Sequence, residues 1–110
     1  KKNSKRMFIR GGKPMLLPSV AYEVFKRDAL YQLMNGGKIT TITDTVMVHC
    51  VFHIKGKIRV DGDNLFTSML DILQDAGILA DDNLVVAGRW EKYPGYKEFE
   101  TIITIEKTNI

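Results

Sequence analysis

The stretch RVDGDNLFTSMLDILQDAGILADDNLVV, residues 59–86, gathers six aspartates into a chain of 110 residues whose formal net charge is +3. Arg59 is the one cation between Arg59 and Asp82, so this window carries a net charge of −5 and the rest of the chain carries +8. Its apolar residues follow helical spacing as far as Ala76, and Gly77 ends the run. The stretch therefore predicts an acidic helix between two strands of a basic protein.

The segments around this helix predict the remaining elements. Apolar residues alternate from Thr45 to Lys55, as in a half-buried strand, and we expect residues 57–60 to continue that strand past a bulge at Gly56. After the helix, strands over 84–93 and 99–106 flank a YPGY turn and are predicted to form a hairpin.

Upstream, the spacing of apolar residues predicts a helix over 20–34, which Ser19 can cap and which Gly36 and Gly37 end. The apolar positions of this helix are 21, 24, 25, 29, 30, 33 and 34. Residues 1–17 are basic and are expected to form an extended arm or an irregular hairpin that ends at Pro18. The predicted fold is therefore a single α+β domain over residues 1–110, a mixed sheet with two main helices packed on it, in the order α-β-α-β-β after an N-terminal basic arm.

Composition limits the classes of protein that fit. A single cysteine, Cys50, excludes an internal disulfide and favours a reducing cytoplasm. The apolar runs are far shorter than the roughly 20 residues of a membrane span, so we expect a soluble protein with no membrane partner. A sequence pI near 9.0 makes nucleic acid a plausible anionic partner.

Two acidic pairs flank the predicted helix: Asp61 and Asp63 around Gly62 at its start, and Asp81 and Asp82 before the next strand. A helix cap, a turn and a solvated loop would explain each pair alone. We expect the two pairs to meet at one end of the sheet, where crowded carboxylates would repel one another without a cation. Oxygen-rich sites of this kind suit Mg²⁺ or Mn²⁺.

The motifs DGDNL and AGILADD, followed by a strand that reaches Lys92, closely resemble the RusA-type Holliday junction resolvases, whose signature is D-x-D-N-L and, after a helix, D-D. The resemblance covers residues 59–92, with weaker support from KKNSKR and PSVAYEVF. It implies a Mg²⁺-dependent endodeoxyribonuclease that resolves four-way DNA junctions as a homodimer in recombination and repair, of a kind often carried by phages and prophages.

By position in the motif, the resemblance makes Asp61, Asp63 and Asp82 the catalytic residues and metal ligands. Asp71 and Asp81 would brace them from outside the ligand shell. Cations and one amide are expected to contact DNA because the basic frame attracts the phosphate backbone; these residues are Lys55, Lys57, Arg59, Asn64, Lys92, Lys5 and Arg6.

The sequence departs from the family pattern at Thr67, where a lysine is common four residues after the second aspartate of D-x-D. Lys55, Lys57 or Arg59 could supply the missing charge; the alternative is a catalytically weak or inactive junction-binding protein of the same fold. The family also places a strand before the N-terminal segment, so we expect some N-terminal sequence to be missing from this chain.

Other reactive side chains are given structural roles. His49 and His53 lie on one face of a predicted strand, about 13 Å apart at ~3.3 Å per residue, which is too far to share a metal ion. We assign them to the surface or to an interface. Cys50 falls on the apolar face of the same strand and is expected in the core.

Overall fold

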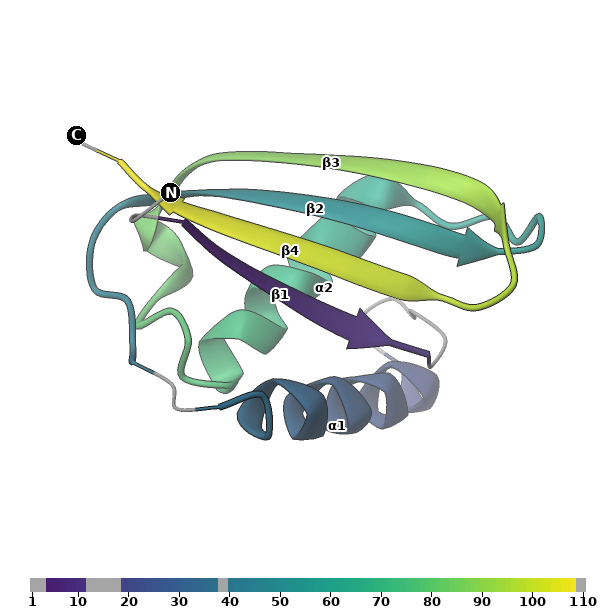
Figure 1. The fold of residues 1–110 in the computed structure, drawn as a ribbon, viewed down its shortest axis with the longest axis horizontal. Helices are drawn as coiled ribbons and strands as arrows, with labels where there is room; N and C mark the ends of the chain where they lie inside the picture. Colours follow the sequence, from purple (N-terminus) through teal and green to yellow (C-terminus); the bar gives the residue numbers. More distant parts are fainter. Residues whose placement is uncertain (1–3, 12–18, 38–39, 109–110) are drawn as a thin grey trace.

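Two helices pack on one face of a four-stranded mixed sheet with the strand order β1-β4-β2-β3 (Figure 1). The computed structural model describes residues 4–11, 19–37 and 40–108. The elements are β1 Ser4–Arg10, α1 Val20–Met34, β2 Val46–Lys55, α2 Gly62–Asp75, the 3₁₀ helix η1 Asp82–Leu84, β3 Val85–Tyr96 and β4 Glu100–Lys107. The predicted α+β class is confirmed. None of the described helices is both long and apolar enough to cross a membrane.

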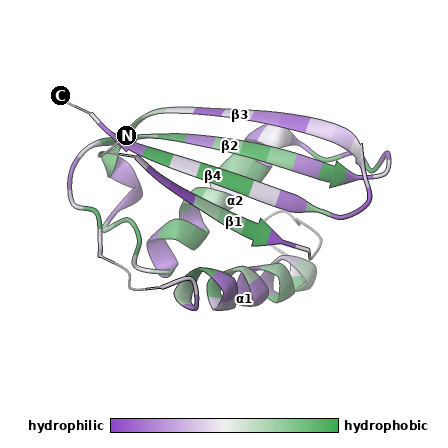
Figure 2. Cartoon of the chain, in the orientation of Figure 1, coloured by the Kyte–Doolittle hydropathy of each residue, from purple (hydrophilic) through white to green (hydrophobic). Residues whose placement is uncertain are grey.

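Strand β2 lies inside the sheet and behaves as its alternating sequence predicts. The apolar residues on one face are almost fully buried beneath the helices: Val46, Val48, Cys50, Phe52 and Ile54. Figure 2 shows β2 as a largely hydrophobic strand interrupted by hydrophilic bands. Strand β4 pairs with β2 in antiparallel orientation and β3 pairs with it in parallel orientation. The buried face of β2 therefore anchors the core.

The predicted hairpin of the last two strands is wrong. Strands β3 and β4 are not neighbours, because β4 lies between β1 and β2. The position of charge agrees with this order: β4 has its charged residues at its two ends, around the apolar run TIITI, whereas β3 carries Arg89, Glu91 and Lys92 in its middle. An apolar strand gains more from an interior place, and charged residues suit the edge of a sheet.

Two other expectations about the strands are corrected. Within the predicted N-terminal arm, Ser4–Arg10 forms β1, which pairs antiparallel with β4 and buries Ile9, so the described order begins with a strand. Residues 1–3 and 12–17 of that arm lie outside the described residues. Strand β2 ends at Lys55 instead of continuing past Gly56, which has φ of +59° and starts a turn.

The helices begin where capping side chains satisfy their first N–H groups. The Ser19 hydroxyl accepts a hydrogen bond from the Tyr22 N–H at 2.9 Å, as the sequence predicts for α1. The buried stripe of α1 differs from the predicted one: Tyr22 is fully buried, whereas Val24 and Met34 are 57% and 59% exposed. In α2 the buried face includes Leu65, Met69, Ile72 and Leu73.

Candidate metal and nucleic-acid site

Helix α2 begins at the first acidic pair. The spacing of the apolar residues favours Asp63 or Asn64 as the cap, but the structure has Asp61 as N-cap, with Oδ1 accepting from the Asn64 N–H at 3.1 Å. Asp63 lies in the first turn, where a negative charge interacts favourably with the helix dipole. Both side chains are exposed. The helix start therefore presents two carboxylates to solvent.

Strand β3 holds this helix start through two side chains on its helix-facing side. The indole Nε1 of Trp90 donates a hydrogen bond to Asp63 Oδ1 at 2.8 Å. The Lys92 Nζ donates to the carbonyl oxygen of Val60 at 2.5 Å. Lys92, expected from the sequence to contact DNA, is thus also a structural support for the segment that carries Asp61.

Gly62 allows the indole to lie against the helix. A Cβ atom at this position would be 2.3 Å from the ring of Trp90, well inside van der Waals contact. The glycine between the two aspartates is buried, although its acidic neighbours are exposed. The D-G-D sequence thus combines an exposed carboxylate pair with a close helix-to-strand contact.

The second acidic pair lies at the other end of α2. The Asp82 N–H donates to Gln74 Oε1 at 2.9 Å, and Asp81 Oδ1 accepts from the Asn83 N–H at 2.8 Å at the start of η1. The expectation that both pairs meet at one end of the sheet is therefore wrong. Strands β2 and β3 are parallel, so the start of β3 lies beside the start of β2. The chain therefore leaves the end of β2, runs back through α2 and enters β3 at the other end of the sheet.

This separation bears on metal binding. Carboxylate oxygens are the donors that Mg²⁺ prefers. Within residues 4–11, 19–37 and 40–108, however, no group of three His, Cys, Asp or Glu side chains lies close enough together to hold a metal ion. The donor chemistry of Asp61, Asp63 and Asp82 suits magnesium, but one described chain does not assemble the three carboxylates into a single ligand set.

Exposed cations border the first acidic pair. Lys55 ends β2, and Lys57 and Arg59 follow in the segment that leads to Asp61. Hydrogen bonds tie this segment to the end of β3, from the Gly56 N–H to the Tyr96 carbonyl and from the Gly95 N–H to the Gly56 carbonyl. Three of the expected DNA-contacting cations therefore lie near the helix start along the chain.

Lys5 and Arg6 are placed differently. They belong to β1, which forms the edge of the sheet opposite to β3. The acidic pair packs against β3, so two strands lie between it and these residues. Any contact that Lys5 and Arg6 make with a nucleic acid would be distant from the helix start.

The polar side of α2 carries Thr67, the residue at which this chain departs from the family pattern. Thr67 lies one turn after Asp63 and donates its hydroxyl hydrogen to the Asp63 carbonyl at 3.0 Å. Asn64, also exposed, uses its backbone N–H for the Asp61 cap. A lysine at position 67 would start from this exposed side of the helix.

Asp71 and Asp75 face α1 and bind it. Asp71 Oδ2 accepts from the Tyr22 hydroxyl at 2.6 Å, and the Lys26 Nζ pairs with both aspartates. Burial and the bond to Asp71 raise the pKa of Tyr22 above its usual value. This contact between the helices was not predicted from the sequence. A polar Tyr22 and Lys26 spaced by four residues on α1 were its only signal.

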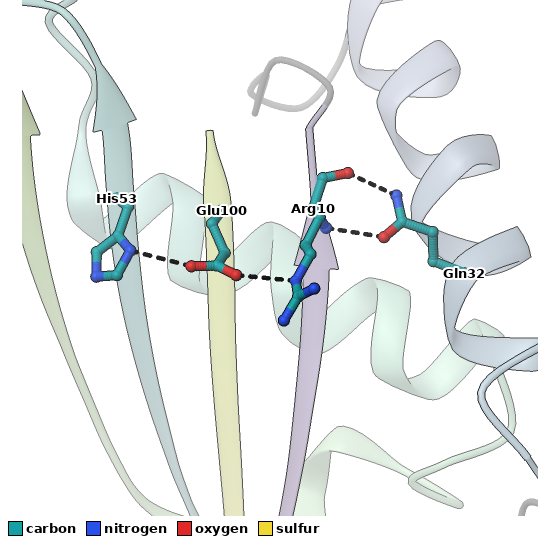
Figure 3. Close-up of polar contacts among 4 residues, drawn as sticks. All are labelled: Arg10, Gln32, His53 and Glu100. Atoms are coloured by element: carbon teal, nitrogen blue, oxygen red, sulfur yellow. Dashed lines mark hydrogen bonds and ion pairs between the residues drawn. The ribbon is translucent and has the colours of Figure 1, made fainter. Parts of the chain in front are cut away.

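The two histidines bind glutamates of neighbouring strands on the sheet face opposite the helices. His49 lies 2.9 Å from Glu91 Oε2. His53 lies 3.2 Å from Glu100 Oε1, and Glu100 Oε2 pairs with Arg10 Nε at 3.1 Å (Figure 3). Cys50 is fully buried, and burial raises the pKa of its thiol to about 12. None of the three belongs to the acidic helix start.

The series of polar contacts continues from Arg10 to Gln32 on α1. The backbone N–H of Arg10 donates to Gln32 Oε1, and Gln32 Nε2 donates to the Arg10 carbonyl, each at 2.8 Å (Figure 3). One side-chain amide thus makes the pair of bonds that a neighbouring strand would make. The end of β1 is fastened to the helix layer.

Exposed carboxylates at the start of α2 follow exposed lysine and arginine side chains along the chain, so this small α+β domain combines an acidic pair with cations of the kind that attract a phosphate backbone. Among protein families, the sequence matches the model of endodeoxyribonuclease RusA over residues 2–106. The chain therefore belongs to the RusA endodeoxyribonuclease family, a family of Holliday junction endonucleases. A search of curated proteins gave no match.

Proposed function

We propose that this protein is a Mg²⁺-dependent endonuclease that cuts four-way DNA junctions in recombination and repair. The observation that carries the proposal is the exposed pair Asp61 and Asp63 at the start of α2, in a chain that matches the RusA family over nearly its whole length. Mn²⁺ is the natural substitute because it accepts the same oxygen donors. Action on cellular or prophage DNA would place the protein in the cytoplasm.

In this proposal Asp61, Asp63 and Asp82 provide the carboxylate oxygens for the metal ion. A bound Mg²⁺ ion would neutralise charge on a phosphoryl oxygen and lower the pKa of a bound water. Lys55, Lys57 and Arg59 would attract the phosphate backbone that bare carboxylates repel. Lys92 donates a hydrogen bond to the carbonyl oxygen of Val60 and so holds in place the backbone that leads from these cations to Asp61.

Two symmetric cuts are needed to resolve a four-way junction, and each chain has one such set of aspartates. We therefore propose a homodimer with two-fold symmetry. The separation of Asp82 from Asp61 and Asp63 within one chain supports an arrangement in which a second copy completes each site. The sheet face near His49, Val51 and His53, on which no described helix packs, and the N-terminal strand are candidate contacts.

The test of the nuclease uses a synthetic four-way junction with and without Mg²⁺. We expect the wild type to cleave only with the metal, and Asp61→Asn, Asp63→Asn and Asp82→Asn to lose cleavage while binding the junction at least as tightly. Asp28→Asn on α1 is the matched control and should cleave normally. Unimpaired cleavage by Asp82→Asn would remove that residue from the assignment.

The second candidate is a junction-binding protein without catalysis, which Thr67 favours because the family lysine is absent. Wild-type binding of the junction without cleavage in Mg²⁺ or Mn²⁺ would support this candidate.

A mixing experiment tests the dimer. If a second copy completes each site, a mixture of Asp63→Asn and Asp82→Asn chains contains heterodimers with one intact site, and single-strand nicking returns. If each chain acts alone, the mixture stays inactive. Sedimentation at micromolar concentration measures the assembly independently, and a monomer that still cuts both strands in one encounter would refute the dimer.

A further inference from the structure

Trp90 joins the sheet to the acidic helix start. It lies on the helix-facing side of β3, opposite Cys50 of β2, and is partly buried against the core. Its ring occupies the space that a side chain at position 62 would need. Its one polar atom, Nε1, donates to Asp63 Oδ1 at 2.8 Å. The indole thus contacts the glycine of D-G-D with its carbons and the second aspartate with its nitrogen.

This bond constrains the Asp63 side chain. A hydrogen bond from an N–H to an ionised carboxylate is stronger than one between neutral groups. The indole ring is held by its packing, so the direction of its N–H is fixed. The hydrogen bond to this N–H therefore restricts the orientation of the Asp63 carboxylate. A carboxylate has two oxygens, so one can accept the indole N–H while the other remains available to a cation.

We propose that Trp90 is a positioning residue for metal binding: its N–H holds the Asp63 carboxylate in the orientation in which its other oxygen can bind a divalent cation. The inference rests on the proposed function, because it deepens the role of Asp63. Partners of this kind outside the ligand shell fix the orientation of metal ligands, and their loss lowers metal affinity about 10-fold to 100-fold.

The variant that isolates the N–H is Trp90→Phe, which keeps an aromatic ring against Gly62 and removes the donor. Tyr93→Phe is the matched control on the same strand, since the Tyr93 hydroxyl binds Glu91 on the opposite face. We expect Trp90→Phe to raise the Mg²⁺ concentration for half-maximal cleavage by about tenfold, with a smaller effect on the rate at saturating Mg²⁺. A structural role would instead lower the rate at every Mg²⁺ concentration.

A spectroscopic test needs no cleavage. Trp90 is the one tryptophan of the chain, so its indole N–H gives a single resonance in a ¹⁵N-labelled sample. Mg²⁺ should shift this resonance in the wild type. In Asp63→Asn, which keeps an oxygen to accept the bond but lacks the charge, we expect the same addition to leave the resonance unchanged.

The outcomes separate this inference from the proposed function. Equal Mg²⁺ dependence for wild type and Trp90→Phe, in a folded protein that cleaves, overturns the positioning role and leaves the nuclease intact. A wild type that neither binds Mg²⁺ by calorimetry nor cleaves overturns both. An indole resonance that Mg²⁺ shifts equally in wild type and Asp63→Asn also overturns the positioning role.

Discussion

At the scale of single residues, the ring of Trp90 occupies the space in which a side chain at position 62 would lie. Glycine is required at position 62 because of the ring that lies beside it; its backbone angles do not include a positive φ. The same principle applies where Gly88 of β3 lies under the ring of Phe66, since a Cβ there would be 2.6 Å from Phe66 Cζ. Close approach of ring and backbone thus sets the distance between α2 and β3.

Gly62→Ala should therefore force the indole away from the helix and break the bond to Asp63. We expect a loss of about 1–3 kcal/mol in the free energy of unfolding, the usual cost of overpacking, measured by urea denaturation. Gly36→Ala is the control, because a Cβ there would meet backbone oxygens only at 3.5 Å. Adding Trp90→Leu should recover part of the loss; strictly additive effects would contradict a steric cause.

Thr67 is the residue at which a gain of function is expected. A lysine one turn after Asp63 would place a positive charge on the exposed side of α2, toward a phosphate held at the helix start. We expect Thr67→Lys to raise the single-turnover cleavage rate by about tenfold, equivalent to ~1.4 kcal/mol of transition-state stabilisation.

If Lys55, Lys57 or Arg59 already fills that role, Thr67→Lys will change little, and alanine at the compensating residue will slow cleavage more than it weakens binding. No effect from any of these four variants would show that a cation near the scissile phosphate is unimportant here.

At the scale of elements, α1 is attached to α2 through a buried phenol. Tyr22 is fully buried and donates to Asp71, while Lys26, one turn later, pairs with Asp71 and Asp75. Burial, followed by the bond to Asp71, raises the pKa of Tyr22, so the folded state keeps the phenol protonated. The contribution of the Tyr22 phenol to the free energy of unfolding is complete below its unfolded pKa of 10.0 and falls as the pH rises above that value.

We expect Tyr22→Phe to lower the free energy of unfolding by about 0.5–1.5 kcal/mol at pH 7, the net value of one hydrogen bond. The variant should also lose less stability than the wild type when the pH rises above 10.0, because it has no phenol to ionise. Denaturation at pH 7 and above pH 10 measures both effects; parallel curves for the two proteins would contradict the assignment. Tyr31→Phe, at an exposed position of α1, is the control.

The element boundaries show what periodicity can and cannot predict. The helix over 20–34, the buried face of β2 and the acidic helix were predicted because period and caps are local properties of the sequence. The pairing of β4 with β2 was missed, because a short turn suggested a hairpin and only the apolar TIITI run indicated an interior strand. The choice of Asp61 as the cap carries no periodic signal, and the bond from Trp90 to Asp63 joins residues far apart in the sequence, so it depends on tertiary packing.

At the scale of the whole molecule, the crossover from β2 through α2 to β3 separates the acidic pairs, and both described helices lie on the same face of the sheet. The family was evident from the D-x-D-N-L and D-D motifs, but motif spacing gave no direction for the crossover. A parallel connection sends the second pair to the opposite end of the helix. The position of Asp82 therefore had to come from the fold.

The amide of Gln32 seals part of the outer border of the sheet. It forms hydrogen bonds with both the N–H and the carbonyl oxygen of Arg10, so a strand of another molecule cannot pair with these two groups. Unprotected sheet edges are where β proteins aggregate. We expect Gln32→Ala to show concentration-dependent association by light scattering, with the wild type and Tyr31→Phe, at an exposed position of α1, unchanged at equal concentration. If the variant stays as dispersed as the wild type, the border is protected by other means. A single glutamine would then contribute only to stability, but if association follows its loss, this amide is what keeps the nuclease from polymerising through β1.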